Sequence, residues 1–128
     1  MVYSKDEKAK MARLLEVFQS FIQEQSYFDI VYSEKIGYLR IVLGTELADD
    51  LVFRISGFDE LLKVLADDML FERLQAKATQ APSPEDLEAI YHLFESNLPF
   101  SPEENRRCME FIESNLTNWE QDMLFVGQ

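Results

Sequence analysis

Residues 58–74, FDELLKVLADDMLFERL, decide the fold, because their apolar side chains recur at the spacing of a helix. One face of the predicted helix carries Phe58, Leu61, Leu62, Leu65 and Met69. Further apolar residues lie off that face, at Val64, Leu70, Phe71 and Leu74. A helix that is apolar around most of its circumference is buried on two sides. We therefore predict a central helix over residues 58–78, shared between a β-rich part before it and a helical part after it.

The part before this helix, residues 1–57, is predicted to hold one helix and a small sheet. Ser4 and Glu7 have the spacing of a capping box, and an amphipathic pattern follows over residues 4–25. Alternating apolar residues predict strands over residues 27–33, 38–43 and 51–55, and the short polar connections favour a three-stranded antiparallel meander. The third strand is ambiguous, because residues 47–55 also fit a helical spacing. Ser56 and Asp59 are expected to cap the central helix.

The helical part, residues 83–128, contains an 18-residue duplication. Residues 83–100, SPEDLEAIYHLFESNLPF, and 101–118, SPEENRRCMEFIESNLTN, share Ser-Pro-Glu at the start and Glu-Ser-Asn-Leu near the end. Each copy begins with a serine N-cap, a proline at the first helical position and an acidic residue that closes a capping box. Each ends at an asparagine that tolerates the left-handed conformation. We predict an αα-hairpin followed by a short helix. Whether the tail from Trp119 to Gln128 docks on the hairpin or exposes an apolar patch stays open.

Length and composition predict one globular domain over residues 1–128. Hydrophobic residues make up 47% of the chain and ten residues are Phe, which is ample for a packed core. The single cysteine, Cys108, excludes an internal disulfide and favours a reducing compartment. No apolar run approaches the ~18 residues that a membrane span needs. We expect a cytoplasmic protein without a membrane partner.

The net charge of −12 is concentrated in the second part of the chain. Residues 1–57 hold 7 basic and 9 acidic residues, and residues 58–128 hold 5 basic and 15 acidic residues, which gives −2 and −10. Such a surface repels phosphate backbones, so no nucleic-acid partner is expected. The acidic part either keeps the protein soluble or attracts a partner protein with a basic surface.

Residue patterns that carry chemistry are sparse. Glu88 and His92 lie one helical turn apart, but one imidazole among flexible carboxylates is a weak metal site, and Cys108 is expected in the core. No serine or cysteine stands in a nucleophile turn, and the four glycines are not grouped to hold a phosphate. The 24 acidic residues guarantee some carboxylate pairs by chance. We predict no catalytic residue, metal or cofactor, and the balance favours a protein that is not an enzyme.

Two surfaces are candidate binding sites. The first, here called the acidic stripe, lies on the first helix of the hairpin and consists of Glu85, Glu88, His92 and Glu95. It either binds a partner or forms a solvated helix face. The second, here called the Tyr/Arg face, is a sheet face on which alternation gathers Tyr27, Tyr38, Arg40 and Arg54. It either binds a ligand or forms the solvated side of an antiparallel sheet.

The predicted fold class is α+β, with an N-terminal helix, a three-stranded antiparallel meander, a central two-sided helix, and a C-terminal αα-hairpin plus short helix. The leading hypothesis for function is a small acidic, non-enzymatic interaction or regulatory protein, such as an adaptor or immunity-type inhibitor, that acts through its acidic helical half. One alternative is an acidic chaperone that works as a homodimer. Another is a ligand-binding or enzyme domain that uses the Tyr/Arg face.

Overall fold

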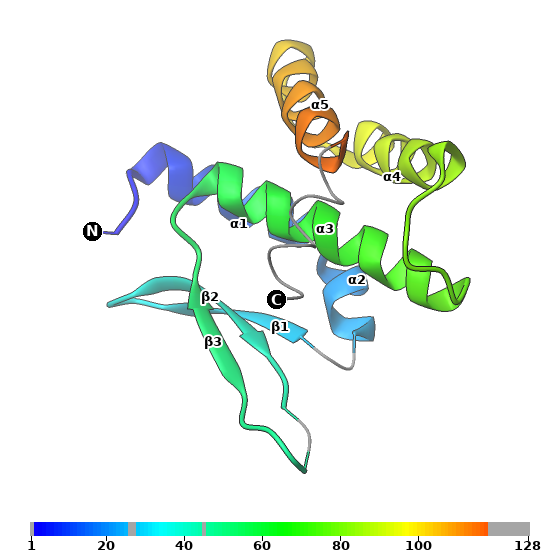
Figure 1. Ribbon diagram of the computed structural model, residues 1–128. Coiled ribbons are helices and arrows are strands. Elements are labelled where there is room, and N and C mark those ends of the chain that lie inside the picture. Colours follow the sequence, from blue (N-terminus) through cyan, green and yellow to red (C-terminus); the bar gives the residue numbers. More distant parts are fainter. Residues whose placement is uncertain (1, 26–27, 45, 118–128) are drawn as a thin grey trace. The chain divides into compact units, whose positions relative to one another are not determined.

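The computed structural model of the chain describes residues 2–25, 28–44 and 46–117 (Figure 1). It confirms the α+β class, because helices at the N-terminus are followed by a three-stranded antiparallel sheet and then by three helices. The chain divides into two compact units, Met1–Leu61 and Leu62–Gln128, which are described separately below. The boundary between them falls inside the central helix, α3 (Phe58–Ala76).

The N-terminal helical segment is broken at Phe18, which corrects the prediction of one continuous helix over residues 4–25. Helix α1 spans Lys5–Val17 and helix α2 spans Gln19–Glu24, and Phe18 between them has φ −100° and ψ 14°. The amide of Phe18 still donates to the carbonyl of Leu14, and the amide of Ile22 donates to the carbonyl of Phe18. The break is therefore a local kink, and Met11, Leu14, Phe18 and Ile22 all remain buried.

The sheet is the predicted meander, in the order β1-β2-β3. Strand β1 spans Phe28–Ser33, β2 spans Gly37–Val42 and β3 spans Leu51–Arg54, so the ambiguous third segment is a strand. Figure 1 shows β2 between the other two strands. The turn between β1 and β2 ends at Gly37, whose φ of +99° is a conformation that residues with a side chain rarely adopt.

The core of the first unit is formed by α1, α2, one side of the sheet and the start of α3. Its buried apolar residues are Tyr3, Met11, Leu14, Phe18, Ile22, Phe28, Tyr38, Ile55, Phe58 and Leu61. The centre of the Phe28 ring lies 6.2 Å from the centre of the Phe21 ring, and the guanidinium carbon of Arg40 lies 5.7 Å from the centre of the Phe28 ring.

Helix α3 has the two-sided burial that its sequence predicts. Its buried apolar residues fall into two helical rows, Leu61, Leu65 and Met69 in one and Phe58, Leu62, Ala66, Leu70 and Leu74 in the other. The helix ends at Ala76, two residues before the predicted end. Ala78, with φ 56°, is the one described residue other than glycine with a positive φ, and it turns the chain out of the helix.

The duplicated segments form α4 (Pro84–Asn97) and α5 (Pro102–Thr117), and their burial repeats with the same 18-residue period. The buried residues Ile90, Phe94 and Leu98 correspond to the buried residues Cys108, Ile112 and Leu116. The serine caps repeat as well, because Ser83 Oγ accepts from the amide of Asp86 and Ser101 Oγ accepts from the amide of Glu104, both at 3.3 Å.

The asparagine ends of the two copies differ from the prediction. Asn97 lies inside α4, and the residue after the helix, Leu98, has φ −62°, so no left-handed residue ends this helix. Asn97 and Asn115 instead donate from Nδ2 to the carbonyls of Leu93 and Phe111, at 2.7 and 2.8 Å. The two copies thus share a side-chain bond to the carbonyl one turn earlier, which satisfies a carbonyl near each helix end.

The predicted short C-terminal helix, and the question of the tail from Trp119 to Gln128, lie outside the described residues. Within residues 2–25, 28–44 and 46–117, no helix combines the length and the apolar character needed to cross a membrane.

Candidate functional site

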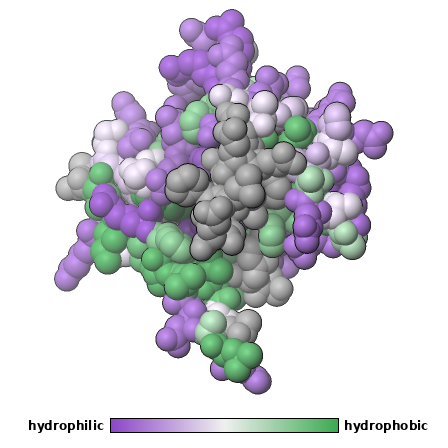
Figure 2. Space-filling view, in the orientation of Figure 1, coloured by the Kyte–Doolittle hydropathy of each residue, from purple (hydrophilic) through white to green (hydrophobic). Residues whose placement is uncertain are grey.

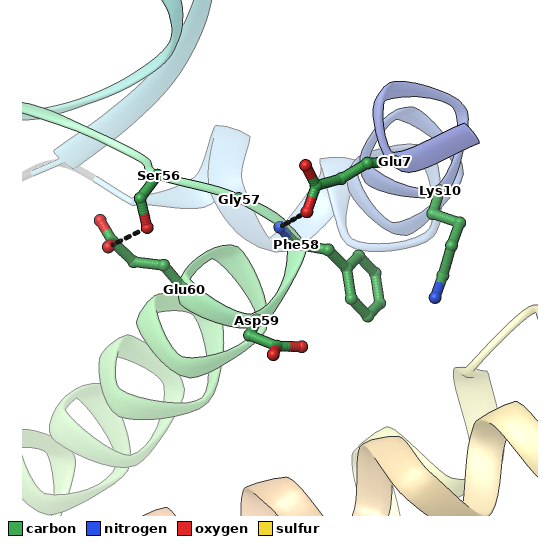
Figure 3. Close-up of a pocket in the computed structure, with 7 residues that line it drawn as sticks. All are labelled: Glu7, Lys10, Ser56, Gly57, Phe58, Asp59 and Glu60. Atoms are coloured by element: carbon green, nitrogen blue, oxygen red, sulfur yellow. Dashed lines mark hydrogen bonds between the residues drawn. The ribbon is translucent and has the colours of Figure 1, made fainter. Parts of the chain in front are cut away.

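A polar hollow of about 450 Å³ lies at the start of α3 in the first unit (Figure 3). Its lining residues come from α1 and from the segment that leads into α3, and they are Glu7, Lys10, Ser56, Gly57, Phe58, Asp59 and Glu60. This set contains three carboxylates and one ammonium, and no histidine or cysteine belongs to it. Several donors and acceptors of the hollow take part in local structure, as the next contacts show.

The first amide of α3 is capped by a residue from α1. Oε2 of Glu7 accepts a hydrogen bond from the amide of Phe58 at 3.2 Å (Figure 3). The hydroxyl of Ser56 donates to Oε2 of Glu60 at 2.7 Å. The predicted cap from Ser56 and Asp59 is therefore wrong, because the carboxylate at the helix start comes from a residue 51 positions earlier. A carboxylate at a helix N-terminus also interacts favourably with the helix dipole.

The contacts in the hollow support the fold at the start of α3. Its helix N-terminus already holds the Glu7 carboxylate, so it is not free to bind an external anion. Lys10 lies with its Nζ 4.4 Å from the centre of the Phe58 ring, a cation–π distance. Within the described ranges, no three or more His, Cys, Asp and Glu side chains come together in a way that could hold a metal ion.

The acidic stripe lies on the exposed side of α4, as the spacing of its residues in the sequence predicts. Glu85, Glu88, His92 and Glu95 are all exposed on α4. The buried residues of this helix, Asp86, Ile90 and Phe94, follow a different row about half a turn away. The period of α4 therefore separates an exposed acidic row from a buried row.

Asp86 is a buried acidic residue that sequence reasoning placed only as part of a helix cap. Its Oδ1 accepts from Lys77 Nζ at 2.6 Å and from Arg73 Nε at 2.7 Å, and its Oδ2 accepts from the amide and hydroxyl of Ser83 at 3.0 and 2.9 Å. These bonds, from Lys77 first, then from the Ser83 amide and Arg73, hold the pKa of Asp86 well below its usual range. Asp86 thus connects the start of α4 to the end of α3. Because Asp86 is buried, the exposed negative charge of α4 comes from the acidic stripe.

The structure does not bring the four residues of the Tyr/Arg face together. Tyr27 lies outside the described residues, Tyr38 is buried, Arg40 is half-buried and Arg54 is exposed. The sheet register pairs Arg40 with Phe53 and pairs Leu39 with Arg54. Residues directly opposite each other share a face, so the two arginines point to opposite sides of the sheet. The expectation that they share one face is therefore wrong.

The error has a simple physical cause, since a shift of one residue in strand pairing moves every side chain to the other face. The sequence of β3 does not prevent such a shift, because Leu51, Val52 and Phe53 are apolar at both alternating positions. Tyr38 is on the buried side, where burial raises the pKa of its hydroxyl. The alternative, a Tyr/Arg face exposed to solvent, is not seen among the described residues either, because Tyr38 is buried and Arg40 is half-buried.

Strand β3 exposes apolar side chains that sequence reasoning did not single out. Leu51, Val52 and Phe53 have exposed fractions of 56%, 59% and 48%. Figure 2 shows apolar residues gathered over the lower part of the view, where Figure 1 places the sheet. Three consecutive apolar residues in a strand at the edge of a sheet were the available clue, because one of the two faces must then expose some of them.

Comparison with protein-family models, with curated proteins and with solved structures found no match for this chain. The function is accordingly inferred from the chemistry and geometry of its own residues.

Proposed function

We propose that the chain is a non-enzymatic interaction protein, a regulator, adaptor or immunity-type inhibitor, that binds a basic protein surface through the acidic stripe. The observation that supports this is the exposure of Glu85, Glu88, His92 and Glu95 along one side of α4. Helix α4 contains no Lys or Arg, so no cation on the helix itself offsets the three glutamates. The proposal places the protein in the cytoplasm, where the buried thiol of Cys108 stays reduced.

The local structure supports the stripe by holding α4 in one place within its unit. The N-terminus of the helix is closed by the capping box of Ser83 and Asp86. Asp86 also forms ion pairs with Arg73 in the last turn of α3 and with Lys77, the residue that follows this helix. A charged surface that is fixed in advance loses less conformational freedom when it binds, which favours affinity.

The expected mode of binding is electrostatic attraction of a basic surface. Complementary charges mainly raise the association rate and select the partner. Because the Debye length falls from about 10 Å at 0.1 M salt to about 3 Å at 1 M salt, binding through exposed glutamates weakens as salt rises.

The test begins with capture of partners from the native host's lysate at low and high salt, followed by identification and purification of the partner. The affinity of the purified partner is then compared between the natural chain and the variant Glu85→Lys/Glu88→Lys/Glu95→Lys. We expect a loss of at least about tenfold, which corresponds to about 1.4 kcal/mol. The variant His92→Asp adds a negative charge to the stripe and is expected to strengthen binding.

The matched control is Glu103→Lys/Glu110→Lys/Glu113→Lys on α5, which changes the net charge by the same amount at three other exposed glutamates. Equal losses in both triple variants would mean that only net charge matters, and the stripe would then have no specific role. Circular dichroism shows whether each variant keeps its helices. Unchanged affinity in the stripe variant rejects the proposal.

A second candidate is the acidic chaperone, and the exposed apolar residues of β3 favour it because unfolded clients bind apolar surfaces. It is tested with reduced lysozyme, a basic client that aggregates as it unfolds. A chaperone slows the aggregation at near-equal molar ratio, and Phe53→Ser weakens that effect. An interaction protein with one folded partner has no such effect on lysozyme.

A further inference from the structure

Strand β3 is an edge strand whose outer side is unpaired by any described segment. The sheet order β1-β2-β3 leaves β3 with a single neighbour, β2. All four residues of the strand, Leu51–Arg54, are exposed. An exposed edge strand with apolar side chains is a template for pairing with another strand, and proteins commonly cover or charge such edges.

The hydrogen-bonding alternation of the sheet determines which backbone groups face outward. The amide of Ile55 donates to the carbonyl of Tyr38 at 2.9 Å, so these two residues form a bonded pair in the ladder. Bonded and non-bonded pairs alternate along an antiparallel ladder, so Phe53 and Leu51 also direct their amides and carbonyls toward β2. The amides and carbonyls of Val52 and Arg54 therefore point away from the sheet, toward the open edge.

This alternation of inward-facing and outward-facing residues limits how β3 of a second copy of the chain can pair with the edge. In an antiparallel pair, outward-facing groups must meet outward-facing groups, so Val52 and Arg54 pair only with even-numbered residues of the added strand. A two-fold axis through Val52 meets this condition. It places Val52 opposite Val52, Leu51 opposite Phe53, and Asp50 opposite Arg54 of the second copy.

Charge favours this register over its neighbours. Arg54 is exposed, and Asp50 immediately precedes the strand on the same alternating face. Asp50 uses Oδ1 to accept from the amide of Gly44 at 2.6 Å, which leaves Oδ2 for a second contact. A shift by two residues in either direction would place Arg54 opposite Val52 or beyond the strand, and the opposite charges would no longer meet.

We propose that a second copy of the chain pairs with β3 in an antiparallel two-fold arrangement centred on Val52, which joins the two sheets into one of six strands. Two Asp50–Arg54 pairs flank the centre, and Leu51 packs against Phe53 on the opposite face. Cross-strand pairs of opposite charge and of aromatic with aliphatic residues are those that stabilise sheets. This dimer goes beyond the proposed function, because it uses the sheet and not the acidic stripe.

The experiment is sedimentation equilibrium of the full chain at loading concentrations from about 5 µM to about 500 µM, which spans micromolar to near-millimolar dissociation constants. We expect the apparent mass to rise with concentration toward twice the monomer mass of 15.0 kDa. A constant monomer mass over the whole range overturns the proposal.

Charge variants test the register. Arg54→Glu places like charges opposite each other and is expected to weaken the dimer at least about tenfold, whereas Arg54→Lys keeps it. The double variant Asp50→Lys/Arg54→Glu restores opposite charges and recovers the dimer. Its matched control, Asp49→Lys/Arg54→Glu, has the same net charge but places the lysine on the other face, so it stays monomeric. Equal behaviour of the two double variants overturns the register.

Val52→Pro tests the edge itself without relying on charge. The amide of Val52 points outward, so proline removes a bond of the dimer and none of the β2–β3 ladder. We expect a monomer with an unchanged circular dichroism spectrum. A folded Val52→Pro variant that dimerises like the natural chain overturns the proposal, because the dimer would then use another surface.

Discussion

The hydroxyl of Tyr3 accepts a hydrogen bond from the backbone amide of Tyr38 at 2.9 Å and so occupies a rung of the ladder between β2 and β3. The same hydroxyl donates to the carbonyl of Ile55 at 2.5 Å, and the amide of Ile55 bonds directly to the carbonyl of Tyr38. In a regular bonded pair the Tyr38 amide would donate to the Ile55 carbonyl itself. Tyr3, two residues before α1, thus connects the sheet to the chain segment that enters α3.

Tyr3→Phe removes this hydroxyl and keeps the ring, which stacks on Tyr38 with 6.1 Å between ring centres. The buried Tyr38 amide and Ile55 carbonyl then lose their hydrogen-bond partner, so we expect a loss of about 1–3 kcal/mol in the free energy of unfolding. Urea denaturation measures it. Tyr32→Phe is the control, because Tyr32 is 40% exposed and its loss of a hydroxyl should change stability by less than about 0.5 kcal/mol. Equal stability of the two variants contradicts the role of Tyr3.

Gly37→Ala tests the turn beside this contact. Gly37 has φ +99°, and a Cβ there would lie 2.6 Å from the hydroxyl of Tyr3. We expect strain and the displaced hydroxyl to cost about 1–3 kcal/mol of stability, measured by urea denaturation. Gly37→Asn separates the two causes, because asparagine tolerates a positive φ better than alanine but still meets Tyr3. A stable alanine variant would show that the turn can adopt another conformation.

Local helix caps and burial patterns could be read from the sequence, and single side-chain contacts between distant positions could not. The caps at Ser83 and Ser101, and the matched burial of Ile90 and Cys108, follow from residue types within one or two helical turns. The contacts of Tyr3 join positions 35 and 52 residues apart, and no local pattern marks a tyrosine for that place.

The candidate binding surfaces show the same contrast between features that were predictable from the sequence and features that were not. The exposure of the acidic stripe follows from helical period alone, because a row opposite apolar residues faces solvent. The faces of Arg40 and Arg54 depend on strand register, which the apolar run in β3 leaves ambiguous. Asp86 looked like an ordinary first-turn acidic residue, and its two cationic partners lie 9 and 13 positions earlier.

Glu7→Ala removes the carboxylate that accepts from the amide of Phe58. Loss of a helix N-cap typically costs about 0.5–2 kcal/mol, and we expect a loss in that range for the start of α3. Hydrogen exchange at the Phe58 amide gives the specific readout, because it should become faster. Glu7→Gln keeps an acceptor oxygen and should lose less stability. Unchanged exchange at Phe58 in Glu7→Ala would show that another group caps the helix.

Asp86→Asn tests the buried ion pairs through the pH dependence of stability. The pKa of Asp86 is lower in the folded chain than in the unfolded chain, where an aspartate has a pKa of about 3.9. Such a group stabilises the fold above the unfolded pKa, and its contribution is lost as pH falls toward the folded pKa. The difference in unfolding free energy between the natural chain and the variant should therefore be largest near pH 7, where the two are compared first. It should shrink steadily once the pH falls below about 4.

Asparagine keeps an oxygen for Ser83, so this substitution removes the charge that Lys77 and Arg73 share while retaining much of the capping box. At neutral pH we expect a larger loss of stability than in Ser83→Ala, which removes only the cap at about 1 kcal/mol. Glu85→Gln, one residue earlier and exposed, is the control and should change stability by less than about 0.5 kcal/mol at every pH. If Asp86→Asn matches the natural chain at pH 7, the ion pairs with α3 do not stabilise this unit, and the fixed geometry assigned to the acidic stripe loses its main support.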